Sequence, residues 1–133
     1  MPVNQSYPKA RDLKVKVVAI ARTDSSTEKC VLPKDAVIAG VYVLQDVNAA
    51  TATATFDLGF SGDTDGILND FTMATTAVGY VAAGAAAGSA VGTKLDSDKV
   101  IVSTYTVGSS TGGGTGYVFI HYFVPGPGES LTS

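Results

Sequence analysis

The apolar and polar positions of the chain alternate in short segments, as they do in β-strands. Residues 53–60 show this most clearly, with two alternating sets: Ala54, Phe56, Leu58 and Phe60 in one, and Thr53, Thr55, Asp57 and Gly59 in the other. A period of two places one set on a dry face of a sheet and the other set in water. We therefore predict a strand at residues 53–60 with one buried face.

Further segments also have strand character. Residues 13–22 alternate and predict a strand that is half-exposed at its start and buried later. A short apolar run at 30–32 precedes residues 35–47, which are apolar on both faces, as a strand buried in a sandwich would be. Residues 99–107 and 116–124 predict the last two strands. Because consecutive strands often pair, we expect these two to form a hairpin.

The segments between the strands predict turns and loops. Glycine and polar residues predict the hairpin connection at 108–115 and a turn at 61–66. A short strand or 3₁₀ turn is expected at 71–73. Residues 74–93 are mainly alanine and glycine, and their four glycines argue against a helix, because each costs roughly 1 kcal/mol in a helix interior. We predict a long, closely packed loop here, with one strand at 78–81.

The composition favours the same fold class. The chain has 17 Val and 15 Thr but only 7 Leu and 2 Glu, and β-branched side chains lose rotamer freedom in helices but pack well on a sheet. About seven or eight short strands suit a two-sheet sandwich or a small barrel. We predict an all-β domain of this kind at residues 13–125. An extended N-terminal arm at 1–12 precedes it and a polar tail at 126–133 follows it.

Length and charge narrow the class of protein. The 133 residues suit one domain with a core of its own. No apolar stretch predicts a membrane helix, and the first residues lack the basic start and apolar run of a secretory signal. The single cysteine excludes an internal disulfide and a cysteine-rich zinc site. The net charge of -3 argues against nucleic-acid binding.

Few residues carry the chemistry of catalysis. His121 is the only histidine, and it shares a strand face with Tyr117, Phe119 and Phe123. A catalytic base needs a nucleophile and an orienting group beside it, and the G-x-S-x-G motif is absent, so we favour a structural role. Cys30 lies beside apolar residues, which predicts a buried, inert thiol. The sequence predicts no enzyme activity and no cofactor.

Three carboxylates in the segment SGDTDGILND form a candidate metal site: Asp63, Asp65 and Asp70. Carboxylates two residues apart in a glycine-bearing loop can bind calcium. An EF-hand loop, however, needs an oxygen ligand at its fifth position, where this chain has Ile67, and a glutamate at its twelfth. We favour a tight turn and keep a weak surface metal site as the alternative.

Charge is distributed unevenly along the chain. Residues 9–34 hold seven Lys or Arg and three acidic residues, whereas residues 35–133 hold two Lys and nine acidic residues. A basic first third on an acidic body could make copies of the chain complementary to one another or to an acidic partner. Ordinary solvated charges are the alternative explanation.

The order of the segments carries a resemblance over roughly residues 13–124. It lies in the first strand LKVKVVAIA, the segments VLPKDAVIAGVYVLQDV and TATFDLGFSGDTDGIL, the Ala/Gly-rich middle and the closing LDSDKVIVSTYTVGSSTGGGTGYVFIHYFV. This layout resembles the small jelly-roll virion proteins of tailed bacteriophages, of the capsid decoration or cement type. The resemblance implies an all-β, antiparallel two-sheet sandwich with jelly-roll topology. The resemblance also implies a non-enzymatic homo-oligomer, often a trimer. It would bind the major capsid protein on the outer capsid surface and stabilise contacts between its subunits, after assembly in the host cytoplasm.

In such a protein the arm would be a partner-binding segment. An extended arm adds contacts when it docks, and several modest contacts with a repeating lattice reinforce one another. We expect residues 74–93 and 108–116 near oligomer or lattice contacts. The arm residues that we assign to partner binding are Val3, Asn4, Tyr7, Lys9 and Arg11.

Three other functions compete with this one. A carbohydrate-binding or adhesion module predicts solvent-facing tyrosines on one sheet and a metal at Asp63 and Asp65. A phage tail or fibre accessory protein differs only in its partner. A small cupin-type enzyme would need several histidines and a carboxylate at a metal, which one histidine does not supply.

Overall fold

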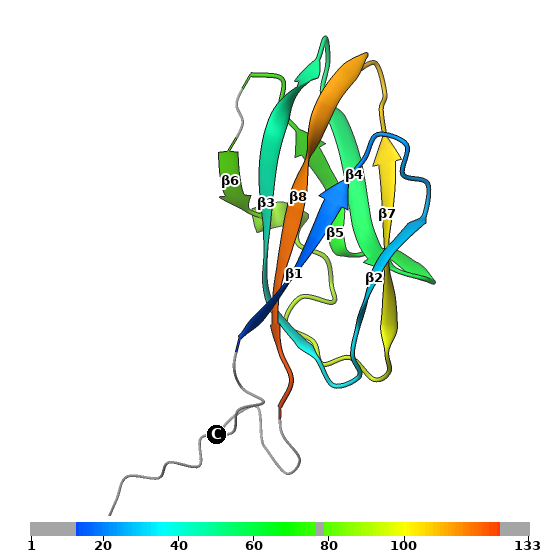
Figure 1. Ribbon diagram of the computed structural model, residues 1–133, viewed down its shortest axis with the longest axis vertical. Helices are drawn as coiled ribbons and strands as arrows, with labels where there is room; N and C mark the ends of the chain where they lie inside the picture. The colour runs from blue at the N-terminus through cyan, green and yellow to red at the C-terminus, as the bar shows by residue number, and fades with distance from the viewer. Residues whose placement is uncertain (1–12, 77–78, 126–133) are drawn as a thin grey trace, which may run out of the picture.

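The computed structural model describes residues 13–76 and 79–125, which form two antiparallel sheets packed face to face (Figure 1). The strands are β1 (Lys14–Ile20), β2 (Thr27–Leu32), β3 (Val37–Ala50), β4 (Ala54–Phe60), β5 (Asp63–Met73), β6 (Gly79–Ala82), β7 (Lys99–Thr106) and β8 (Gly112–Phe123), with one 3₁₀ turn, η2 (Gly84–Ala86). The predicted all-β sandwich is confirmed. The described residues include no helix that is long and apolar enough to cross a membrane.

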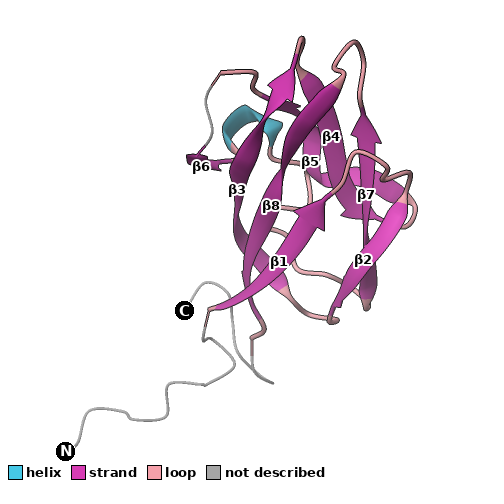
Figure 2. Cartoon of the chain, turned by 45° about the horizontal axis from the view of Figure 1, so that its top comes forward, coloured by secondary structure: helices cyan, strands magenta, loops and turns pink. Residues whose placement is uncertain are grey.

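The strand order is that of a jelly roll. One sheet runs β1-β8-β3-β6 and the other β2-β7-β4-β5, as the two layers of Figure 2 show. The antiparallel pairs β1·β8, β2·β7, β3·β6 and β4·β5 are those of one long hairpin folded over on itself. The further pairs β3·β8 and β4·β7 complete the two four-stranded sheets. This arrangement defines the jelly-roll sandwich.

The inner faces of the two sheets supply one core. The alternation predicted at 53–60 is confirmed, since Ala54, Phe56, Leu58 and Phe60 are all buried. Ile38 and Val43 of β3 face them from the opposite sheet and are fully buried in the same cluster. Burying apolar surface from both layers is what holds the sheets together.

The predicted hairpin between the last two strands is wrong. β7 lies between β2 and β4 in one sheet, and β8 lies between β1 and β3 in the other. The connection through residues 107–111 therefore crosses from one sheet to the other at the end of the sandwich. Neighbouring strands often pair, but a jelly roll pairs its first strand with its last and works inward from there.

The predicted turn at 61–66 is too long. Only Ser61 and Gly62 separate β4 from β5, and Gly62 adopts a φ of +96°, which glycine tolerates best. β5 then runs without interruption to Met73 and includes the short strand that was expected at 71–73. Two register shifts against β4 accommodate this glycine- and aspartate-rich sequence.

The Ala/Gly-rich segment packs closely, as predicted. Its expected strand at 78–81 corresponds to β6. Beyond η2, backbone N–H groups donate across the sandwich edge: Gly88 to the carbonyl of Ile67 at 2.8 Å, and Gly92 to the carbonyl of Ile38 at 2.7 Å. A side chain at Gly88 would overlap the backbone of Gly66, so this close approach requires glycine.

Candidate interaction surface

The outer face of the sheet β1-β8-β3-β6 is covered by apolar and aromatic side chains. The Cα register of the four strands places their outward-facing residues next to one another. We call this surface the aromatic face; its residues are Val15, Val17 and Ala19 of β1, Tyr117, Phe119, His121 and Phe123 of β8, Gly40, Tyr42 and Leu44 of β3, and Tyr80 and Ala82 of β6. Val17 is 54% exposed and Tyr80 is 51% exposed.

Four rings form a cluster in the middle of the aromatic face. The rings of Tyr42 and Tyr80 stack with centroids 5.3 Å apart and planes 8° from parallel. His121 lies 5.0 Å from Tyr42, and Phe119 meets Tyr80 edge-on at 5.5 Å. Such pairs stabilise their own geometry by about 0.5–1.5 kcal/mol each. These contacts hold the four rings in a fixed arrangement on the outer face of the sheet.

The aromatic face carries no Asp, Glu, Lys or Arg among these positions, and Asp46 of β3 lies at its rim, where it accepts a hydrogen bond from Oγ1 of Thr115 at 3.5 Å. The outer face of the other sheet is more polar. There, register brings Thr55 and Asp57 of β4 beside Thr106 and Thr104 of β7. The outer faces of a sandwich normally both meet water, so the outward side chains of their strands are mostly polar. The sequence interpretation that residues 35–47 are buried on both faces is thus wrong for Tyr42, whose side chain lies on the half-exposed outer face.

The first strand contributes to the same surface. Val18 and Ile20 of β1 are buried, but the alternating Val15 and Val17 remain exposed. The expectation that this strand becomes buried toward its end holds only for its inward side chains. A run of outward valines on an edge strand is uncommon on a sheet face that meets only water.

His121 lies within the aromatic face, on the same side of β8 as Tyr117, Phe119 and Phe123, as predicted. Its ring contacts the ring of Tyr42. Cys30 is half-buried on β2, and burial raises the pKa of its thiol, with the nearby Lys16 opposing part of the rise. A thiol whose pKa is raised holds less thiolate and is a weak nucleophile.

The three aspartates of the candidate metal site are exposed positions of β5 and are not brought together as a ligand set. No group of three or more His, Cys, Asp or Glu that could hold a metal occurs in residues 13–76 and 79–125. The backbone N–H of Asp70 donates to Oδ1 of Asp57 at 2.7 Å, and Asp70 has a φ of +52°. Asp63 faces a different feature, a surface hollow beside the β4–β5 turn.

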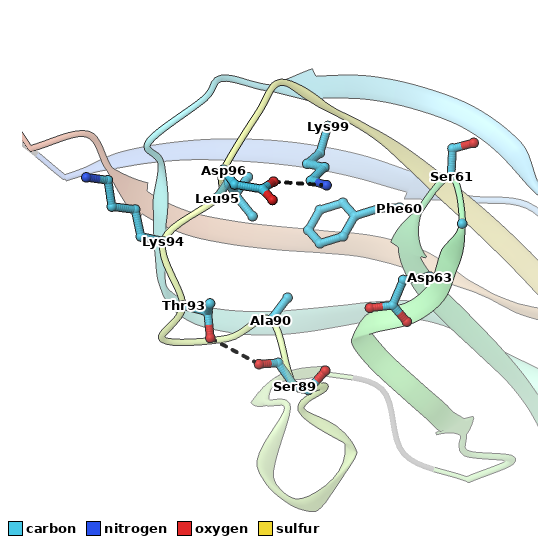
Figure 3. Close-up of a pocket in the computed structure, with 11 residues that line it drawn as sticks. Phe60, Ser61, Asp63, Ser89, Ala90, Thr93, Lys94, Leu95, Asp96 and Lys99 are labelled. Carbon is cyan, nitrogen blue, oxygen red and sulfur yellow. Dashed lines mark hydrogen bonds and ion pairs between the residues drawn. The ribbon is translucent and has the colours of Figure 1, made fainter.

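The hollow has a volume of about 440 Å³ and lies between this turn and residues 89–99 (Figure 3). Both lysines of the hollow are paired with carboxylates, since Nζ of Lys99 lies 3.2 Å from Asp96 and Nζ of Lys94 lies 3.7 Å from Asp35. In Figure 3, Asp63 lies apart from the Lys99–Asp96 pair. The hollow therefore brings together no group of free charges of one sign that would attract a charged ligand.

The uneven charge of the sequence is only partly separated in space. β1, which lies beside β2 at one edge of the sandwich, carries Lys14 and Lys16, although β2 adds Glu28. At the far end of the sheet that contains β2, β5 carries Asp63, Asp65 and Asp70. Complementary edges of this kind favour particular orientations when charged surfaces meet. The predicted partner-binding residues Val3, Asn4, Tyr7, Lys9 and Arg11 lie outside the described residues.

An arginine that the sequence reasoning missed anchors the start of β8. The Arg22 guanidinium donates to the carbonyl oxygens of Ser110 and Gly113 at 2.8 and 3.1 Å, and it lies over the Tyr105 ring. The Tyr105 hydroxyl donates to the carbonyl of Gly114 at 2.6 Å. These contacts fix the loop that leads into the aromatic face, and no local pattern in the sequence marks them because the partners are far apart along the chain.

This arrangement predicts alkaline destabilisation. Burial raises the pKa of the Tyr105 hydroxyl, and Arg22 opposes part of the rise. Folding therefore favours the protonated hydroxyl, so its contribution to stability is present below the ordinary tyrosine pKa of about 10 and is lost as pH rises above it. Urea unfolding at about pH 9 and about pH 11 should show a steeper loss for the natural chain than for Tyr105→Phe. Equal losses would contradict this assignment.

A known capsid chain shares this fold without close sequence similarity. The sequence matches no protein-family model and no curated protein. The structure is similar to a chain of the cyanophage Pam1 capsid asymmetric unit, with a TM-score of 0.64 and 16% sequence identity over 94% of each chain. At this identity the similarity establishes a shared fold, and because it spans almost the whole of both chains, the shared fold is the complete sandwich.

Proposed function

We propose that this chain is a non-enzymatic virion structural protein of the capsid decoration or cement type. The observation that carries the proposal is the shared fold over 94% of both chains with a component of a phage capsid asymmetric unit. The described surface agrees with this role. It offers an aromatic face for association.

The physical basis of such a role is repeated contact. A small sandwich that touches several capsid subunits gains effective concentration with each contact, so weak individual contacts add up to stable attachment. The partner is the major capsid protein at the outer capsid surface, and the chain acts as a homo-oligomer, for which we propose a trimer. The arm at residues 1–12 supplies extended contacts to that partner.

Co-sedimentation tests this proposal. Capsids purified from the phage that encodes this chain, stripped of the chain and mixed with the purified protein, should sediment it in saturable, repeated stoichiometry. A chain lacking residues 2–12 should bind at least ~10-fold more weakly, since each lost contact reduces effective concentration. Unchanged binding would show that the arm does not contribute to attachment. Absence of any binding to the capsid, with binding to isolated tails, would favour a tail accessory protein.

One observation favours a second function, carbohydrate binding. Tyr42, Tyr80 and Tyr117 lie on one outer face, which is the cluster of solvent-facing tyrosines that a sugar-binding module requires. Stacked aromatic rings bind the apolar faces of sugars, but such sites also place polar groups around the sugar. A glycan array with reproducible hits that Tyr80→Ala abolishes would support this function; an array with no hits would remove it.

A further inference from the structure

We propose that the aromatic face packs against other copies of this chain, around the threefold axis of the proposed trimer, and is buried in the homo-oligomer. The proposal names the surface of self-association. It does not depend on whether the oligomer is attached to a capsid, so it and the proposed function can fail separately.

The size of the aromatic face suits an interface. Strands lie about 4.8 Å apart and outward side chains repeat every ~6.8 Å along a strand, so four strands with about three outward positions each span roughly 400 Å². That is comparable to the largest apolar patch on a typical single chain, and such patches often bind other molecules. A stable interface buries roughly 800 Å² on each partner, with an apolar centre and a polar rim. The aromatic face has the size of that centre.

The charge of the aromatic face also favours another copy as its partner. Burying an unpaired charge in an interface is costly, so a partner surface that faces the aromatic face must itself be nearly free of charge. Another copy of the face meets this requirement, because its own positions include no Asp, Glu, Lys or Arg, and Asp46 lies only at the rim, where it bonds to Thr115. The outer face of the other sheet does not, since it presents Asp57 among its threonines.

Residues 1–12 are another possible occupant of the aromatic face that the chain itself offers. That segment reads MPVNQSYPKARD and includes Lys9, Arg11 and Asp12. Docking it on the aromatic face would place these charges against a surface that has none to pair with them. A second copy is therefore the better occupant.

The shape of the face also suits packing between copies. Its large rings, such as Phe119 and Tyr42, stand beside small positions, such as Gly40 and Ala82. Alternation of large and small side chains allows two surfaces to interdigitate at the density of a protein interior. Tyrosine adds hydroxyls that can bond across the interface or to water at its rim.

Multi-angle light scattering of the full chain tests the proposal with a matched pair of variants. Val17→Lys places a charge in the aromatic face, and Val31→Lys makes the same change at a valine of similar exposure, 54% against 47%, on the edge strand of the other sheet. The natural chain should have a mass of at least twice 13.5 kDa. Val17→Lys should weaken association by ~30-fold or more, whereas Val31→Lys should leave it unchanged.

Circular dichroism and thermal unfolding of each variant establish that it is folded, and Tyr117→Lys repeats the test if Val17→Lys does not fold. A monomeric natural chain would overturn the proposal. An oligomer that resists both Val17→Lys and Tyr117→Lys would also overturn it, because association would then use another surface. Stronger association after deletion of residues 2–12 would show that this segment covers the face, and would likewise overturn it.

Discussion

Leu58→Ala is expected to destabilise the chain by about 3–5 kcal/mol. Leu58 is fully buried in the centre of β4, where it lies opposite Leu68 of β5 and Ser103 of β7. Strands on both sides hold its backbone in place, so the sheet cannot close over the space that the lost side chain leaves. The expected loss therefore combines the apolar transfer free energy with the free energy of a cavity.

Equilibrium unfolding in urea measures this loss as a change in the midpoint at constant slope. Leu58→Met is the matched control, since it conserves volume and should cost less than about 1.5 kcal/mol. A loss of less than about 1 kcal/mol for Leu58→Ala would mean that the two sheets are not packed around this residue.

Gly116→Ala is expected to cost about 3 kcal/mol or more. Gly116 lies in β8 opposite the register shift of β3 between Gln45 and Val47. A Cβ atom there would overlap the carbonyl oxygen of Leu44 and lie 2.9 Å from the Cα of Gln45. Both are backbone atoms of a neighbouring strand, so relief of the overlap requires the central strands to move apart.

Gly112→Ala is the matched control for this change. It makes the same substitution at the start of the same strand, where an added Cβ meets no atom within 4 Å. It should change stability by less than about 0.5 kcal/mol or slightly increase it, because alanine reduces the entropy of the unfolded chain. Equal effects of the two substitutions would contradict the close approach of β8 to β3.

Side-chain alternation predicted which residues face the core, but it did not predict which strands are neighbours. The period of two is a property of a single strand, so the alternation at residues 53–60 identifies the inward side chains from the sequence alone. Pairing depends on contacts between residues far apart in the chain, such as Val17 with Phe119. The wrong hairpin between the last two strands follows from this limit. The wrong length of the turn after Phe60 has another cause, since aspartate and glycine occur both in turns and in irregular strands.

The aromatic face could be predicted only in part. The strand period placed His121, Tyr117, Phe119 and Phe123 on one side of a strand, and the structure confirms this. That Tyr42 and Tyr80 complete the surface depends on the register of three strands, which a local pattern does not contain. Apolar residues on both sides of a strand indicate burial, but they do not distinguish burial in the chain's own core from burial against another molecule.

Cryo-electron microscopy of virions purified from the source of this chain tests the central proposal, attachment to a capsid as an associated structural protein, most directly. The account predicts jelly-roll densities on the outer capsid surface, repeated with the capsid lattice and grouped so that their aromatic faces are buried between copies. Particles whose outer surface lacks such densities, or in which the chain occurs only in the tail, would contradict it.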